Sequence, residues 1–250
     1  MKPEIIVVTA AYGHDRIGEL GGQQALVPMI AAAGADGVEI RRELLSEAEI
    51  SNLAALGKAI ADASLAAFYS VPEALFTAKG ALNPNLARHF AEAKQLNARL
   101  IKYSLGHYQQ GTDCAPLQAM LSDQPFRLVV ENDQTRCGRL AALENYLTDK
   151  EPVGMTFDMG NWLWVGDNPV QAATSLARFV SYIHVKAAAP TADGWRAVEL
   201  DKADSLWRET LALLPSAVPR GIEFPLEGDD LTAVTRHYVD LLRGINHDHA

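Results

Sequence analysis

The sequence predicts a single (β/α)8 TIM barrel over residues 1–250. Short apolar segments, each followed by a turn and an amphipathic helical segment, recur eight times along the chain, which is the pattern of a parallel α/β fold. None of these segments is followed by a GxGxxG or GxxxxGK[ST] loop, as open nucleotide-binding sheets often are. A length of 250 residues is ordinary for a barrel. We therefore expect a closed barrel, with an open parallel sheet as the alternative.

Most of the expected strands are apolar until their last one or two residues, which is typical of strands buried on both faces. They cover residues 4–9, 37–40, 65–70, 100–105, 128–131, 154–158, 182–185 and 221–224. Barrel enzymes carry their active sites at the carboxyl ends of the strands. The polar residues that close these strands are therefore the first candidates for function.

Helix start signals lie between the strands. Residues 46–49 form a capping box ahead of an Ala- and Leu-rich helix. Asn83-Pro84 and Asn168-Pro169 each place an N-cap residue before a proline at the first helical position. Gly57 lies inside a helix and is expected to weaken it slightly. The longest irregular segment, residues 187–202, is expected to be a lid or a substrate loop.

Net charge, cysteine spacing and the lengths of the apolar stretches argue against several classes of function. The net charge is -9 and no run of Lys and Arg occurs, which disfavours binding of nucleic acid. The two cysteines form no CxxC pair, as expected in a reducing cytoplasm. There is neither a signal-peptide pattern nor an apolar stretch of the roughly 20 residues that a membrane span needs. The sequence predicts a cytoplasmic protein without membrane or nucleic-acid partners.

Four consecutive strands end in residues that commonly bind metals: Glu131, Asp158, His184 and Glu223. They are separated by 27, 26 and 39 residues, so each belongs to its own strand at a similar height on the barrel. One such residue alone would more often be structural, but four in succession favour a metal site. Three carboxylates and an imidazole suit one divalent ion, with Mn²⁺ favoured and Mg²⁺, Co²⁺ or Zn²⁺ as alternatives. Without a cation, crowded carboxylates would raise one another's pKa.

The sequence resembles the xylose-isomerase-like TIM-barrel superfamily, which includes sugar isomerases, sugar epimerases and endonuclease IV. The matching stretches span nearly the whole chain and read GADGVEI, VVEN, FDMGN, IHVK and GIEF, at residues 34–40, 129–132, 157–161, 183–186 and 221–224. The resemblance implies that the four strand-end residues are the metal ligands shared by this superfamily.

Differences from the motifs of particular family members reduce the number of reactions that the chain is expected to catalyse. Endonuclease-IV-like enzymes use additional histidines to bind three metals, but here the third and fourth strands end in Tyr-Ser and no Asp-x-His follows His184. Ketose 3-epimerases often have a His, a Glu and an Arg at positions that correspond here to Asn161, Cys137 and Pro190. DNA repair and that specific epimerase activity are therefore disfavoured. The IHVK stretch also resembles barrel dehydratases.

The resulting hypothesis is a metal-dependent isomerase or epimerase acting on a sugar, polyol or sugar acid. Glu131 and Glu223 would be both ligands and acid/base groups, in roles that could be exchanged, because they come from opposite flanks of the site. Asp158 and His184 would be ligands only. The alternatives are a metal-dependent dehydratase of a polyol or keto-acid and a non-catalytic barrel.

Further side chains are candidates for binding substrate: Glu39, Lys102, Asn161, Trp162, Lys186 and His107. Strand alternation leaves open whether the first two point inward, and Lys186 could instead form a salt bridge at the rim. Trp162 could stack on a sugar or pack against a neighbouring loop, and His107 could reach substrate or be solvated. Neither of the last two strand-end loops is basic and glycine-rich, which favours an unphosphorylated carbohydrate. The resemblance also suggests a homodimer.

Overall fold

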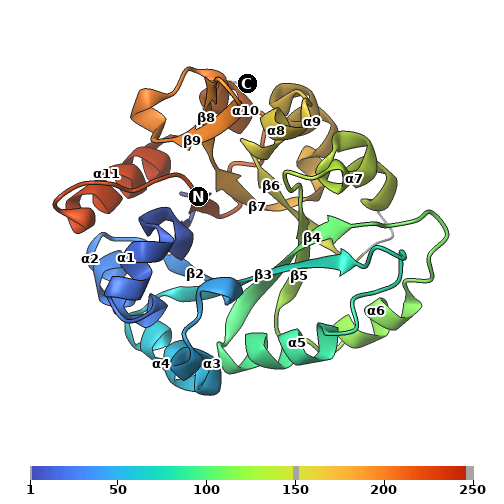
Figure 1. Cartoon of the computed structure of the whole chain (residues 1–250), viewed down its shortest axis with the longest axis horizontal. Coiled ribbons are helices and arrows are strands. Elements are labelled where there is room, and N and C mark those ends of the chain that lie inside the picture. Colours follow the sequence, from blue (N-terminus) through green and yellow to red (C-terminus); the bar gives the residue numbers. More distant parts are fainter. Residues whose placement is uncertain (1, 149–151, 246–250) are drawn as a thin grey trace.

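The computed structural model describes residues 2–148 and 152–245 and confirms the closed barrel. Parallel strands follow one another around the barrel in the order β1-β10-β7-β6-β5-β4-β3-β2, and helices surround them (Figure 1). The barrel strands are β1 Ile5–Val8, β2 Gly37–Arg41, β3 Ala66–Phe76, β4 Ala98–Gly106, β5 Arg127–Glu131, β6 Gly154–Asp158, β7 Val180–Val185 and β10 Arg220–Ile222.

The outer ring closes where the last helix meets the first ones. Helix α11 contacts α2 and β1, so the two ends of the described chain lie beside each other (Figure 1). The helices are α1 His14–Glu19, α2 Val27–Ala32, α3 Glu47–Ser51, α4 Leu53–Asp62, α5 Leu86–Gln95, α6 Ala115–Leu121, α7 Leu140–Tyr146, α8 Asn161–Val165, α9 Pro169–Leu176, α10 Leu206–Ala212 and α11 Leu231–Gly244. Within the described ranges, none of them is long and apolar enough to cross a membrane.

Two of the three predicted helix starts are confirmed. Ser46 and Glu49 form the reciprocal capping box of α3, and the Asn168 side chain accepts hydrogen bonds from two backbone N–H groups at the start of α9. The start predicted at Asn83 is wrong, because α5 begins only at Leu86. The Asn83 side chain instead accepts from the Asn85 N–H and donates to Glu73.

Gly57 has a packing role that the sequence did not reveal. A Cβ built on this residue would lie 2.7 Å from the Gln95 carbonyl oxygen and 2.8 Å from backbone atoms of Leu96. Glycine therefore lets α4 pack directly against the end of α5. This contact offsets the intrinsic cost of glycine in a helix.

The segment after β7 is not irregular as predicted. Strands β8 Ala187–Thr191 and β9 Gly194–Val198 pair antiparallel as a hairpin outside the barrel sheet. Its turn contains Gly194 with φ of +139°, a conformation that favours glycine. The final barrel strand also ends earlier than predicted, so Glu223 lies just beyond β10.

Strand alternation builds the barrel interior in layers. A small apolar cluster lies inside the barrel and consists of Ile6, Phe68, Leu100, Val129 and Tyr182, with Ala66 packed against it. Residues two positions later on the same strands share the inward face and lie nearer the carboxyl end. These are the polar residues Lys102, Glu131 and His184, among others. An apolar layer thus supports the polar layer at the functional rim.

Candidate metal centre

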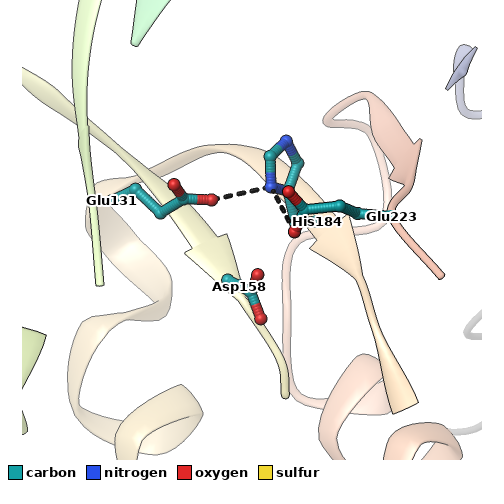
Figure 2. A group of neighbouring side chains, drawn as sticks. All are labelled: Glu131, Asp158, His184 and Glu223. Atoms are coloured by element: carbon teal, nitrogen blue, oxygen red, sulfur yellow. Dashed lines mark ion pairs between the residues drawn. The ribbon is translucent and has the colours of Figure 1, made fainter. Parts of the chain in front are cut away.

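The four predicted ligands converge at the carboxyl end of the barrel. Glu131 and Asp158 end β5 and β6, His184 lies near the end of β7, and Glu223 follows β10. One potential ligand atom from each lies within 4.8 Å of those of the other three. Figure 2 shows the four side chains pointing toward a common space. The parallel strands bring together residues that are far apart in the sequence.

The contacts around His184 indicate what the cluster could bind. Its Nδ1 atom lies 2.7 Å from Glu131 Oε1 and 3.1 Å from Glu223 Oε2 (dashed in Figure 2). Although buried, His184 Nδ1 and Glu131 Oε1 have no hydrogen-bond partner. Buried polar atoms without partners are costly. A divalent ion among these nitrogen and oxygen donors would satisfy both atoms, so the residues fit a metal ion.

Glu39 and Lys102 point inward and support the ligands from within the barrel. The buried His184 Nε2–H donates to Glu39 Oε2 at 2.7 Å, which orients the ring so that Nδ1 faces the carboxylates. The Lys102 ammonium donates to Glu131 Oε2 and lies 3.8 Å from Glu39 Oε1. Both side chains are almost completely buried. They contact each other and the predicted ligands His184 and Glu131, and neither is among the residues that line the cavity described below.

Lys186 and Asn161 lie on the other side of the ligands. The Lys186 Nζ atom is 3.2 Å from Asp158 Oδ2, 3.2 Å from Glu223 Oε2 and 3.1 Å from Asn161 Oδ1. Asp158 Oδ1 accepts from the backbone N–H groups of Gly160 and Asn161, so the turn after β6 holds this carboxylate. Lys186 is thus in direct contact with two of the four predicted ligands.

Two of the predicted substrate contacts are not placed at the site. Trp162 is completely buried and packs against Phe157, with ring centroids 5.3 Å apart. Helix α8 begins at Asn161 and directs this indole into the core rather than toward substrate. Trp164 is nearer the site, its ring 5.8 Å from Lys186 Nζ. His107 is exposed after β4 and is not among the residues that line the cavity described below.

Burial and the charges of the cluster together shift the pKa values of Asp158 and Glu131 in opposite directions. Burial raises the pKa of Asp158 to about 8; Glu223 adds to this effect and Lys186 opposes it. Burial also disfavours ionised Glu131, but the charges of Lys102 and His184 outweigh it and lower the pKa to about 2. Crowding of carboxylates is therefore only partly compensated by the neighbouring cations. A bound metal ion would complete the compensation.

A cavity of about 420 Å³ is lined by Glu223, one of the four predicted ligands. Its wall includes Glu223, Lys186, Arg41 and Tyr12, together with Ala197 of the β9 strand. Arg41 was not predicted from the sequence. Its Nη1 donates to Glu223 Oε1 at 2.9 Å, and its place two residues after Glu39 on β2 was the signal that it shares the inward face.

Comparisons with known proteins agree with this architecture. No family model and no curated protein matches the sequence. A xylose isomerase-like TIM barrel/4-hydroxyphenylpyruvate dioxygenase fusion protein aligns over 94% of this chain with a TM-score of 0.71 and 16% identity. The alignment spans 41% of the fusion protein, so this chain corresponds to less than half of it.

Two smaller solved structures match along nearly their whole length. A probable 3-DHS dehydratase from Bacillus anthracis is 13% identical and aligns over 97% of this chain and 100% of its own, with a TM-score of 0.64. A D-psicose 3-epimerase is 14% identical over 97% of this chain and 96% of its own, with a TM-score of 0.61. The predicted resemblance in fold is confirmed: this chain is a closed TIM barrel with the same fold as these solved structures.

Proposed function

We propose that the protein is a divalent-metal-dependent isomerase or epimerase that moves a proton on a sugar, polyol or sugar acid. The observation that carries this proposal is the placement of two carboxylates around one imidazole nitrogen. Glu131 and Glu223 approach His184 Nδ1 to 2.7 and 3.1 Å. They come from β5 and from the residue after β10, so they flank the cluster on opposite sides.

The proposed chemistry needs one group to remove a proton and another to return it. A divalent ion held by Glu131, Asp158, His184 and Glu223 would polarise a substrate carbonyl and acidify the neighbouring C–H bond. Glu223 lines the cavity and is the better placed of the two glutamates to remove that proton. Glu131, held by Lys102, would return a proton from the opposite flank. Asp158 and His184 would serve as ligands.

Dehydration is the second candidate, and Lys186 is the observation that favours it. Its ammonium lines the cavity and contacts Glu223 at 3.2 Å. A base beside an ammonium group could remove a proton while the ammonium protonates a departing hydroxyl group. The fold relatives include both a D-psicose 3-epimerase and a probable 3-DHS dehydratase, so similarity does not favour either reaction.

The two candidates differ in what happens to the substrate in heavy water. Protein loaded with Mn²⁺ should be incubated in D₂O with a panel of ketoses, aldoses, polyols, sugar acids and keto-acids. With an isomerase or epimerase, the substrate would take up deuterium next to the carbonyl, detected by NMR, without losing water. A dehydratase would give a product that has lost water, detected by mass spectrometry. Neither change with any compound, at full metal occupancy, would contradict the proposal and favour a non-catalytic barrel.

A further inference from the structure

We infer that Arg41 and Lys186 form a carboxylate-binding subsite beside the metal ligands, and that the substrate is an unphosphorylated sugar acid. This inference rests on the proposed function and narrows its substrate class. It is carried by the position of the two cations, by the carboxylate that already lies between them, and by the charge of the site.

The backbone places both cations one layer above the ligands. Arg41 is two residues beyond Glu39 on β2, and Lys186 is two residues beyond His184, directly after β7. Side chains two positions apart on a strand share a face, so both continue the inward-facing row toward the rim. Both line the cavity of about 420 Å³, and their side chains are 20% and 12% exposed. They are therefore partly desolvated groups that a ligand in this cavity would meet.

Glu223 shows that a carboxylate fits between these two groups. Its Oε1 accepts from Arg41 Nη1 at 2.9 Å, and its Oε2 lies 3.2 Å from Lys186 Nζ. The opposite edge of the guanidinium, Nε and Nη2, is held by Glu43 at 2.9 and 2.8 Å. Glu43 thereby fixes the orientation of Arg41 while Nη1 faces the cavity side. A planar guanidinium recognises carboxylates with defined geometry.

Ligation of a metal ion would change the charge that these cations experience. The inner network contains three cations, Lys102, Lys186 and Arg41, and four carboxylates, Glu39, Glu131, Asp158 and Glu223. In a metal-bound site, where His184 is neutral and all four carboxylates are ionised, these side chains together carry a charge of negative one. A divalent ion would make it positive by one. A bound metal ion would also interact with the carboxylates of Glu223 and Asp158. The positive charges of Arg41 and Lys186 would then be less well compensated by these carboxylates.

An anionic substrate would restore that compensation, and a neutral sugar would not. With Glu223 drawn toward the metal ion, Arg41 would keep Glu43 and Lys186 would keep Asn161 as partners, and each would lose a buried carboxylate. A ligand carboxylate near both cations should therefore gain binding energy. Glu43 is partly exposed and Glu227, at the mouth of the cavity, is exposed, so solvent screens both. Glu227 also disfavours a more highly charged phosphate ester at the entrance. A single carboxylate therefore matches the site better than a phosphate group.

Matched pairs of ligands provide the test. D-glucuronate with D-glucose, and D-gluconate with D-glucitol, differ chiefly in the carboxylate, and glucose 6-phosphate supplies a phosphate. Each should be titrated calorimetrically into the Mn²⁺-loaded protein and into the variants Arg41→Gln, Arg41→Lys and Arg99→Gln. Arg99 is 52% exposed, pairs with Glu4 and does not line the cavity, so its variant is the control for loss of an arginine.

We expect at least one acid to bind about tenfold more tightly than its neutral partner and than the phosphate ester. Arg41→Gln should abolish this preference, Arg41→Lys should restore part of it, and Arg99→Gln should leave it unchanged. A preference that survives in Arg41→Gln would mean that the carboxylate binds elsewhere, for example to the metal, and would overturn the inference.

The remaining outcomes separate this inference from the proposed function. Equal binding of acids and neutral sugars, tighter binding of the phosphate ester, or no binding of any compound would each overturn the inference. If Mn²⁺ still binds and the neutral sugars undergo proton exchange, the proposed function stands without it. If the wild-type protein binds no Mn²⁺ at all, both fail.

Discussion

Two polar clusters of similar composition lie on opposite sides of the barrel wall, and they differ in how completely their atoms are paired. The inner cluster comprises Glu39, Lys102, Glu131, Asp158, His184, Lys186 and Glu223. The outer cluster lies between β3, β4 and α5 and comprises Arg42, Tyr69, Glu73, His89, Glu92 and Tyr103. Each combines glutamates, cations and a completely buried histidine.

The outer cluster is closed by ordinary hydrogen bonds. Arg42 donates twice to Glu92, at 2.8 and 3.0 Å, and the Tyr69 hydroxyl donates to the same carboxylate at 2.7 Å. His89 Nδ1 and the Tyr103 hydroxyl are 2.8 Å apart. None of the buried side-chain atoms of these six residues lacks a partner. Such a network stabilises the packing of α5 against the barrel.

The inner cluster is not closed in this way. Glu39 Oε1, Glu131 Oε1 and His184 Nδ1 are buried without hydrogen-bond partners. The two clusters have similar residue types, and the inner one is distinguished by buried donor and acceptor atoms that converge without hydrogen-bond partners, as expected of a site that binds a ligand. Substitutions of matched residues in the two clusters test this distinction.

The largest difference is expected in catalysis. Glu131→Gln, assayed at saturating Mn²⁺, should slow proton exchange on the substrate by about 10²- to 10⁴-fold, because it removes a proposed acid/base group. The matched outer variant Glu92→Gln should retain nearly the wild-type rate. Deuterium incorporation followed by NMR measures both. Similar losses in the two variants would indicate a general effect on folding and would contradict the assignment.

A smaller effect is expected on metal affinity. Glu39→Gln should weaken Mn²⁺ binding about 10- to 100-fold, because Glu39 orients the imidazole of His184 without binding the ion itself. Calorimetric titration measures this constant, with Glu92→Gln again as the control. An unchanged affinity in Glu39→Gln would show that the ring is held by other contacts.

The outer cluster should contribute to stability instead. Glu92→Gln should lower the free energy of unfolding by about 1–2 kcal/mol at neutral pH, because Arg42 loses its charged partner. Burial opposes ionisation of Glu92, but the hydrogen bonds from Arg42 and Tyr69 lower its pKa below the usual 4.5.

The sign of that shift gives a pH dependence. The folded state binds this proton less tightly than the unfolded chain, so the stabilisation is complete above the unfolded pKa and is lost as pH falls through the folded one. Urea unfolding should therefore show a difference in the free energy of unfolding between wild type and Glu92→Gln at pH 7, and a smaller difference at about pH 3. A difference that grows on acidification would refute the assigned role of Glu92.

The smallest effect concerns competition for ligands. Lys186 lies 3.2 Å from oxygens of both Asp158 and Glu223, where its charge should repel a metal ion. Lys186→Met should therefore tighten Mn²⁺ binding. The expected gain is only roughly threefold to tenfold, because partial solvation of Lys186 weakens its repulsion of the ion. Arg42→Met, in the outer cluster, should leave the affinity unchanged. Weaker binding in Lys186→Met would mean that this lysine organises the ligands rather than competing with the ion.

Sequence patterns predicted the barrel and the ligand cluster because both depend on strand periodicity. Each predicted ligand lies at the end of its own apolar strand or within one residue of it, and parallel strands end at one rim, so proximity followed from order alone. Parity also identified the shared face of His184 and Lys186. The sequence could not show that Glu39 and Lys102 bond to ligands from β7 and β5, since those pairings join residues 145 and 29 positions apart.

The predictions that were wrong or incomplete depended on local geometry. Trp162 follows a strand end as a substrate contact would, but the first turn of α8 directs it into the core. The segment after β7 contains Ala, Pro and few β-branched residues, so its composition did not predict the two strands of the hairpin. Asp193-Gly194 was the turn signal that could have indicated it. Arg41 was not predicted because the expected second strand ended at residue 40, one residue before it, and because its partner Glu223 is 182 residues away.

The central claim is that Glu131, Asp158, His184 and Glu223 hold one divalent ion. The most direct test is calorimetric titration of Mn²⁺ into EDTA-treated wild-type protein and into Glu223→Gln, with circular dichroism to verify that both are folded. We predict one ion per wild-type chain and binding at least about 100-fold weaker in the variant, because a ligand is lost. Folded wild-type protein that binds no Mn²⁺, or equal affinity in both proteins, would contradict the account.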